Sequence, residues 1–491
     1  MENQIKQLLQ TGMDHHNVGH LDEAKACYEK VLTLDPNQSD AIHFLGVVAT
    51  AKGEVETAVA HFNRAIAIAP DNPACHNNLG NLHQSQQNYL AAISCYEKTL
   101  ELNPQHHMAY NNIGAAHIRL GNYDTAHTMC RKALDLEPNY AAAWNNLGDC
   151  CSNLGQLEEA LSYYDKALKL EPEMVDANWN RALCLLHMGD LAQGFAAYHW
   201  RWKRQNTPRR DIDPHLKWNG SNFCGRSIFI YEEQGLGDTL QFVRYLPYLK
   251  AAGGRVILEC SPALVRLLEP LDCIDKLWVR KRQGSTRDID RFDSHCPIMD
   301  LPHHFQTTRE TIPSQVPYIH ADAAMTAWWK PQLGDSSDFK VGIVWAGNPN
   351  HRNNRHRSCK LSAFEGLAKI PGVSLYGLQK DKYPEWTDVE LDQVLTRDLG
   401  DALFDFADTA ALVANMDLVI TVDTAVAHLA GAMGKPTWVI LPLNADWRWM
   451  RQGETSAWYP SMTLFRQAEL GQWEAVFKNM EEKLVQNLSE K

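Results

Sequence analysis

The sequence predicts a multidomain protein in which an all-α superhelical solenoid of repeats precedes an α/β region of two Rossmann-like halves. Three observations lead to this prediction. A 34-residue period runs through the first 205 residues, strand-like apolar runs alternate with helical stretches after residue 225, and 491 residues are too many for one core. We expect the solenoid at 1–205, a link at 206–224, and the α/β halves at 225–335 and 336–491, the second with a C-terminal helix.

Composition and charge are those of an ordinary globular chain. The net charge of −12, from 59 acids and 47 bases, argues against a general nucleic-acid binder. No apolar run approaches the roughly 20 residues of a membrane span, and the polar start has no secretory core. The 12 cysteines include no CxxC pair, which argues against a disulfide framework or a zinc ribbon. We expect a cytoplasmic protein without a nucleic-acid partner or a membrane span.

Three sequence registers keep the 34-residue period over five copies. They are Gly12, Gly46, Gly80, Gly114 and Gly148, then Ala24, Ala58, Ala92, Ala126 and Ala160, and finally Pro36, Pro70, Pro104, Pro138 and Pro172. We interpret each copy as two antiparallel helices that cross closely at Gly and Ala, with Pro ending the second helix. The pattern resembles tetratricopeptide (TPR) repeats, with five full copies over 5–172 and a degenerate sixth from Val175.

A ladder of asparagines with the same period is expected on the concave face of the array. Its members are Asn78, Asn112, Asn146 and Asn180. An amide both donates and accepts, so the ladder suits the backbone of an extended peptide, but it equally suits hydrogen bonds between repeats. The ladder also resembles that of O-linked N-acetylglucosamine transferases, and this resemblance implies a groove for a protein acceptor.

The link is basic and aromatic. The stretch 199–218 holds six Lys/Arg and three Trp, a composition that would suit nucleic acid. We favour a docking role instead, because the end of a solenoid must be covered by another surface.

The α/β region predicts parallel sheets, because its strands are apolar on both faces. The predicted strands are 227–233, 255–260 and 276–280 in the first half, and 340–347, 373–379, 417–423 and 436–442 in the second. A polar hinge at 331–340 separates the halves. Ligands of such folds bind at the carboxyl ends of the strands.

The first strand is followed by Gly235, Gly237 and Asp238. The glycines would let the backbone approach a ligand, and Asp238 at the start of the next helix would accept a proton from an acceptor hydroxyl. The alternative is that Asp238 is a plain N-cap, which the residues alone favour.

A basic loop follows the strand 340–347. Its candidate ligand groups are Asn348, Arg352, Arg355 and Arg357. Positive charge at a strand end suits a diphosphate, which Arg grips bidentately. Which arginine contacts phosphate stays open. A metal on His351 and His356 is not favoured, since no carboxylate or Cys accompanies them.

The strand 417–423 leads into a third candidate site. Asp423 and Thr424 end the strand, and a helix begins at Ala425, so its free N–H groups and positive dipole end would bind an anion. His428 on this helix is either a satisfied core histidine, which the residues favour, or part of the site.

Together these three groups resemble glycosyltransferases of the GT-B fold, and among them the heptosyltransferase-like family 9. The opening motif corresponds to 236–238 and 246–249, and the closing motif to 423–430 with Pro436. The resemblance implies an inverting transfer with Asp238 as general base. It implies that Asp423, Thr424 and Ala425 hold the donor phosphates, with Ala425 in place of the family glycine. It also places Gln379 near the donor base.

The resemblance further implies a nucleotide-sugar as substrate, with no metal and no cofactor. The fusion of TPR repeats to such a domain resembles bacterial protein glycosyltransferases, including flagellin-modifying ones, and implies a protein Ser/Thr acceptor. The alternatives are a TPR adaptor with an inactive α/β region, or an enzyme acting on a glycan or lipid. A dinucleotide oxidoreductase using Glu259 is not favoured, since Leu240 replaces the third glycine of that fingerprint. Two Asp-x-Asp runs, at 211–213 and 288–290, are interpreted as loop charges.

Overall fold

The computed structural model describes residues 1–204, 207, 210, 212–280, 291–351, 354–469 and 471–490. The chain forms two compact units, Met1–Arg181 and Ala182–Lys491. The helix α11 (Val175–Met188) crosses this division. Arg352, Asp211 and the run 288–290, which carry sequence predictions, lie outside the described residues.

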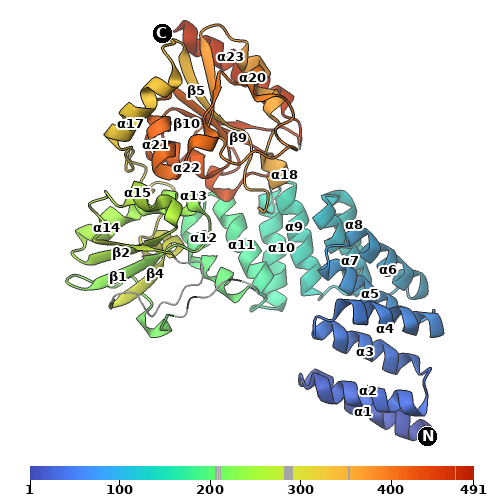
Figure 1. Cartoon of the computed structure of the whole chain (residues 1–491). Helices are drawn as coiled ribbons and strands as arrows, with labels where there is room; N and C mark the ends of the chain where they lie inside the picture. The colour runs from blue at the N-terminus through green and yellow to red at the C-terminus, as the bar shows by residue number, and fades with distance from the viewer. Residues whose placement is uncertain are drawn as a thin grey trace. The chain divides into compact units, whose positions relative to one another are not determined.

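The first part of the chain is a row of antiparallel helices, as the repeats predict (Figure 1). Ten helices precede α11 in the described chain, and α12 (Leu191–Ala197) follows it. They are α1 (Glu2–Asn17), α2 (Leu21–Leu34), α3 (Ser39–Ala51), α4 (Val55–Ile68), α5 (Pro73–Ser85), α6 (Tyr89–Leu102), α7 (His107–Leu120), α8 (Tyr123–Leu136), α9 (Ala141–Asn153) and α10 (Leu157–Leu170). The predicted helical array is confirmed.

The glycine and proline registers have the expected physical causes. A Cβ atom on Gly80 would lie 2.6 Å from the ring of Tyr96, so only glycine lets α5 cross α6 at that point. Ala92, in the second register, is fully buried at the same crossing. At the end of α2, Asp35 is extended because Pro36 follows, and the helix ends at Leu34.

The α/β region contains a four-stranded sheet in the order β3-β2-β1-β4, and every pair is parallel. Its strands are β1 (Ser227–Tyr231), β2 (Arg255–Cys260), β3 (Lys276–Val279) and β4 (Ser294–Pro297). The first three were predicted. The fourth was not predicted, because its sequence, SHCP, contains no apolar run, although all four residues are buried.

A second, six-stranded parallel sheet has the order β10-β9-β8-β5-β6-β7. Its strands are β5 (Phe339–Val344), β6 (Val373–Gly377), β7 (Arg397–Asp398), β8 (Leu418–Val422), β9 (Thr437–Leu441) and β10 (Met462–Arg466). Both faces are covered, since Val341 and Ile343 join the core on one face and Val344 joins the core on the other. The expected α/β region of two parallel sheets is therefore confirmed.

Helices are present at the three predicted places: after β1, after β8 and at the C-terminus. The predicted helix after β1 is broken into α13 (Leu236–Phe242) and α14 (Leu246–Ala251), and Pro247 lies in the first turn of α14. The helix after β8 is α22 (Ala425–Ala432), and α23 (Glu474–Ser489) is the C-terminal helix. Within the part of the chain that the structure describes, no helix is both long and apolar enough to cross a membrane.

The basic residues of the link pair with acids of the first α/β half. Arg201 makes two hydrogen bonds to Glu233, at 2.7 and 2.9 Å, and one to Asp300 at 2.5 Å. Arg210 contacts the carboxylate of Glu259 at 2.5 Å, so that this acid is not free to bind a ribose. Two basic residues of the stretch 199–218 therefore bond acids of the first α/β half, while the docking role of the stretch stays a prediction.

Candidate active site

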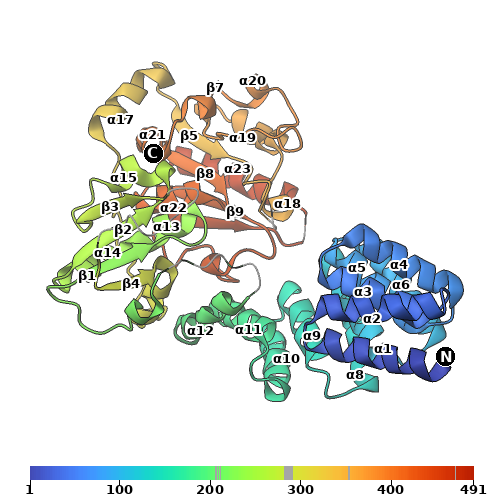
Figure 2. The same ribbon diagram turned by 60° about the horizontal axis from the view of Figure 1, so that its bottom comes forward.

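The carboxyl ends of four parallel strands meet at one place in the second unit. The turn after β1 leads into α13 and the turn after β8 leads into α22, and these two helices lie side by side (Figures 1 and 2). The loops after β5 and β9 bring their own charged residues to the same place. We call Asp238, Arg357, Asp423, Asp446 and Arg448 the strand-end cluster. Parallel α/β folds bind their ligands at this edge of the sheet.

Asp238 is the third residue of α13, and the N-cap is Gly235. Its Oδ2 accepts a hydrogen bond from the Gly235 N–H at 2.7 Å, as a carboxylate in the first helical turn does. Its Oδ1 accepts a hydrogen bond from the guanidinium of Arg448. Asp238 is therefore not the N-cap of α13, as the alternative interpretation had it. Its side chain bonds the backbone at the helix start and also contacts the other α/β half.

Arg448 is the centre of the cluster. It lies in the 3-10 turn Trp447–Trp449 after β9 and is nearly buried. Its Nη1 donates to Asp446 at 2.7 Å and its Nε donates to Gln241 at 2.8 Å, while Nη2 donates to Asp238. Although burial opposes it, the carboxylates of Asp238 and Asp446 raise the pKa of Arg448 above its ordinary value. This guanidinium therefore joins α13 of the first half to the strand end of the second.

Gly237 packs against His428 on α22. A Cβ atom on Gly237 would lie 2.7 Å from the imidazole ring, so glycine is required for the two helices to approach. The His428 ring is buried, stacks on Trp449 at 5.2 Å and bonds the hydroxyl of Tyr459 through Nδ1 at 3.0 Å. Burial, aided by Arg448, lowers the pKa of His428 to about 3. The ring is therefore buried and hydrogen-bonded, as a core histidine is, while a role for His428 in nucleotide-sugar binding stays a prediction.

Two carboxylates and one arginine share the second half of the cluster. Burial and the neighbouring Asp446 raise the pKa of Asp423 to about 6, although Arg357 opposes this shift. Although burial opposes it, Arg448 lowers the pKa of Asp446. Burial lowers the pKa of Arg357, and its buried Nε has no hydrogen-bond partner among the described residues. An anion placed beside Arg357 would give this nitrogen a partner.

The start of α22 has no side-chain cap. Thr424 is the N-cap residue, but its side chain makes no capping hydrogen bond. The Thr424 hydroxyl instead pairs with that of Thr421 at 3.1 Å. Ala425 is the first helical residue, and the dipole of the helix favours negative charge there.

The remaining predicted donor residues have different surroundings. Arg355 is exposed and donates to His356, and Asn348 is exposed and accepts from the Asn350 N–H. The Gln379 amide is buried between Ala346, whose N–H it accepts at 3.0 Å, and Asp381, to whose carbonyl it donates at 2.9 Å. Of the described arginines in this loop, the structure brings only Arg357 into the cluster.

The asparagine ladder makes hydrogen bonds between repeats. Each Nδ2 donates to a side chain of the preceding repeat: Asn78 to His43 at 2.8 Å, Asn112 to Asn81 at 3.1 Å, Asn146 to Asn111 at 2.8 Å and Asn180 to Asn145 at 3.1 Å. The four side chains are half-buried. Their amide oxygens accept no hydrogen bond from the described residues. The inter-repeat interpretation is thus confirmed for the donor side of each amide, while peptide binding stays a prediction.

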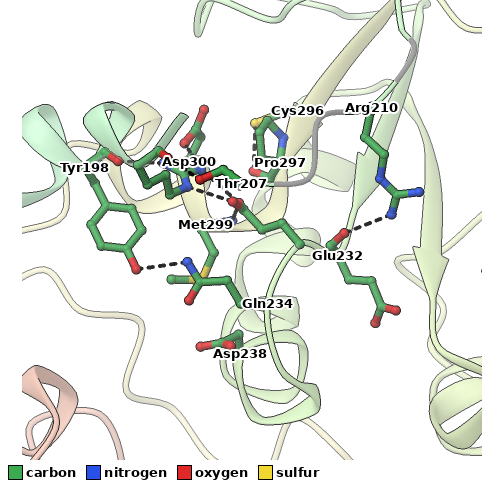
Figure 3. Close-up of polar contacts among 12 residues, drawn as sticks. Tyr198, Thr207, Arg210, Glu232, Gln234, Asp238, Cys296, Pro297, Met299 and Asp300 are labelled. Carbon is green, nitrogen blue, oxygen red and sulfur yellow. Dashed lines mark hydrogen bonds and ion pairs between the residues drawn. The ribbon is translucent and has the colours of Figure 1, made fainter. Parts of the chain in front are cut away.

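From the sequence, Trp447, Arg448 and Trp449 were expected to line the donor or acceptor side, because they follow a strand. No role was predicted for Asp446 or Tyr198. The Tyr198 hydroxyl accepts a hydrogen bond from Gln234 at 3.2 Å, close to Asp238 (Figure 3). Within the described residues, no group of three or more His, Cys, Asp or Glu side chains is placed to hold a metal ion.

Models of known protein families match segments in both parts of the chain. Models of tetratricopeptide repeats match residues 13–38, 46–87, 71–136 and 141–174. The model of glycosyltransferase family 9 (heptosyltransferase) matches residues 402–473, which include Asp423, Asp446 and Arg448. The chain therefore carries TPR repeats and a C-terminal glycosyltransferase family 9 domain.

Curated and solved proteins show similarity to parts of the chain. Protein FlbA of Caulobacter vibrioides is 30% identical over 306 residues, which are 57% of this chain and 50% of that protein. The chain thus spans half the length of this relative. The crystal structure of MamA protein matches 35% of this chain and 94% of its own, with 24% identity and a TM-score of 0.31. The pilF structure from Pseudomonas aeruginosa matches 41% and 90%, with 20% identity and a TM-score of 0.37.

Proposed function

We propose that this protein is an inverting, metal-independent glycosyltransferase of GT-B architecture that moves a sugar from a nucleotide-sugar to a Ser/Thr hydroxyl of a protein. The observation that carries this proposal is the contact between Asp238 and Arg448. It joins the candidate base of the first half to the family 9 segment of the second half. A base and an anion site side by side are required for transfer from a nucleoside diphosphate to a hydroxyl.

On the acceptor side, Asp238 accepts the proton of the attacking hydroxyl. The hydroxyl oxygen forms a bond to the anomeric carbon of the sugar as the bond from that carbon to the diphosphate oxygen breaks. Attack from the face opposite the leaving group inverts the anomeric configuration. Gly235 supports this step by holding the second carboxylate oxygen through its N–H.

On the donor side, the start of α22 and Arg357 receive the diphosphate. Thr424 and Ala425 offer an uncapped helix start, and Arg357 offers a buried, unpaired Nε within the described cluster. These preorganised groups stabilise the negative charge that develops on the leaving diphosphate. The carboxylate of Asp423 faces the same place, and the raised pKa favours its protonated form beside an anion.

The repeat array supplies the protein acceptor. The amide oxygens of Asn78, Asn112, Asn146 and Asn180 are open, while their N–H₂ groups are bound to neighbouring repeats. Such a ladder accepts hydrogen bonds from the backbone N–H groups of an extended peptide and therefore selects little by sequence. Recognition of the acceptor then depends on contacts outside the ladder.

Thermal unfolding in the presence of ADP, UDP, GDP and CMP tests the donor site. We expect at least one nucleoside diphosphate to raise Tm, because a ligand that binds only the folded protein stabilises it. Arg357→Met should weaken this nucleotide about tenfold or more by removal of a charged hydrogen bond. Arg355→Met, in the same loop but exposed, is the matched control and should bind as the wild type does. Failure of every nucleotide to stabilise the protein would contradict the proposed function.

A further inference from the structure

Both carboxylate oxygens of Asp238 accept a hydrogen bond in this structure. One oxygen accepts from the Gly235 N–H and the other accepts from Arg448, and the side chain is 15% exposed. A general base must accept a proton from its substrate within hydrogen-bond distance. The oxygen that faces the second α/β half is the one that Arg448 covers. Release of Arg448 would therefore open a position on Oδ1 for an acceptor hydroxyl.

Different atoms of the Arg448 guanidinium contact different partners, so that one contact can break while the others remain. Its Nη2 is committed to Asp238, while Nη1 and Nε have separate partners in Asp446 and Gln241. The guanidinium also lies 4.3 Å from the ring centroid of Trp447. Loss of the Asp238 contact alone would thus leave Arg448 anchored at three other points, within the same cluster.

A diphosphate would compete for this arginine. Arg357 gives the donor region one positive charge, and the acids Asp423 and Asp446 lie close to it. A diphosphate carries more negative charge than Arg357 alone can offset, and it would be repelled by the two carboxylates. Arg448 is the other arginine of the strand-end cluster, and its planar fork matches phosphate oxygens as well as it matches a carboxylate.

We propose that the ion pair between Arg448 and Asp238 breaks when the donor binds, and we call this ion pair the latch. Without donor, Arg448 holds the carboxylate of Asp238. When the nucleotide-sugar binds, its diphosphate draws the Nη2 end of Arg448 away, and the freed Oδ1 becomes available to the acceptor hydroxyl. The proton then passes to Asp238, the new bond to the anomeric carbon forms, and the electrons of the broken bond stay on the diphosphate, held by Arg448 and Arg357. This inference rests on the proposed function and adds an order to it: donor before acceptor.

A double-mutant cycle on ligand binding tests the latch without any acceptor. The probes are inorganic pyrophosphate and the nucleoside diphosphate that binds best among ADP, UDP and GDP, measured by calorimetry on the full chain. Asp238→Asn should lower Kd about tenfold, since the arginine no longer has to leave an ion pair before it binds phosphate. Asp272→Asn, an exposed acid in the same half, is the matched control and should leave Kd unchanged.

The second arm of the cycle separates the latch from simple charge removal. In an Arg448→Met background, Kd should rise, and Asp238→Asn should no longer tighten binding. A tightening that persists without Arg448 would show that only the negative charge of Asp238 matters, and it would overturn the latch. Arg448→Gln, which keeps a hydrogen-bond donor for Asp446, replaces Arg448→Met if the latter does not fold.

The outcomes distinguish the two proposals. If no diphosphate binds the wild type, the proposed function and the latch both fail. If a diphosphate binds, but Asp238→Asn leaves Kd unchanged or raises it, the latch alone is wrong. A merely structural role for Arg448 predicts that loss of its carboxylate partner disturbs the site and weakens binding, which is the opposite of the result we expect.

Discussion

Gly237 illustrates how a residue of a motif acts through packing. The sequence suggested that this glycine lets the backbone approach a ligand. In the structure its Cα faces the ring of His428, and the contact brings α13 and α22 together. The position of Asp238 beside the second half depends on this approach. The small residue therefore serves the site indirectly, by allowing two helices from different halves to meet.

Gly237→Ala is expected to lower the free energy of unfolding by about 1–3 kcal/mol, because the added methyl would overlap a fully packed ring. Chemical denaturation of the full chain measures this loss. Gly235→Ala is the matched control, since a Cβ there would meet only the Asp238 carboxylate at 3.4 Å, an ordinary contact. Equal stability of the two variants would contradict the packing role.

His428 makes stability depend on pH. The folded state keeps this histidine neutral with a pKa of about 3, while the ordinary value is 6.5. Below pH 6.5 the unfolded chain therefore binds a proton that the folded chain does not, and the folded state loses about 1.4 kcal/mol per pH unit.

Comparison with His428→Gln isolates this effect. Asp423 acts in the opposite direction, because its raised pKa makes the folded chain bind the extra proton between about 3.8 and 6. Denaturation of both proteins at pH 5 to 7 should show a steeper acid-side loss in the wild type than in the variant. Parallel curves would show that His428 is protonated in the folded state as readily as in the unfolded chain.

Single residues of the cluster differ in how far the sequence predicts them. Asp238 and Asp423 follow apolar strands directly, so a local pattern points to each. Arg448 is 210 positions from Asp238 in sequence, and nothing local to either residue indicates their ion pair. Arg357 was one of three equivalent arginines until the fold showed which of the described ones lies, half-buried, beside the carboxylates.

At the scale of elements, the helices α11 and α12 brace the loop that carries Arg448. The ring of His187, near the end of α11, bonds the carbonyl of Ala445 through Nε2 at 3.0 Å. Phe195 on α12 packs edge-on against Trp447 at 5.5 Å. The end of the degenerate sixth repeat is thus part of the unit that carries the candidate site.

His187→Ala should lower the free energy of unfolding by about 1 kcal/mol through loss of a hydrogen bond. It should also weaken nucleoside diphosphate binding, because the loop 445–450 loses a support. Calorimetry and denaturation together measure the two effects. His199→Ala is the control, since that ring is exposed and, among the described residues, its one hydrogen bond is to the carbonyl of Ala196. Unchanged binding in His187→Ala would contradict the bracing role.

The elements that the sequence predicted are those with a strong local pattern. The apolar strands β1, β5 and β8 were found because both of their faces are buried. The strand β4 was missed because its letters are polar or small, and burial by neighbours rather than hydropathy makes it a strand. The helix after β1 was predicted unbroken, but Pro247 begins a new helix there and the backbone passes through a 3-10 turn.

At the scale of the whole molecule, the chain combines a repeat array with a two-sheet α/β region. The period of 34 residues predicted the array fully, since each repeat contacts mainly its neighbours and local pattern suffices. The observed division into compact units lies inside α11, and residues from Ala182 onward pack within the second unit. Tertiary contacts such as those of His187 and Arg201 set this division, and they leave no periodic signal in the sequence.

Transfer of a labelled sugar to Ser/Thr-containing proteins or peptides tests the central claim most directly. Asp272→Asn should transfer at the wild-type rate, because that acid is exposed and is not a member of the cluster. Asp238→Asn should bind the nucleoside diphosphate yet lose transfer about 10²-fold or more, since an amide cannot accept the proton. Full transfer by Asp238→Asn, in a protein that still binds the nucleotide, would contradict the claim that Asp238 is the general base.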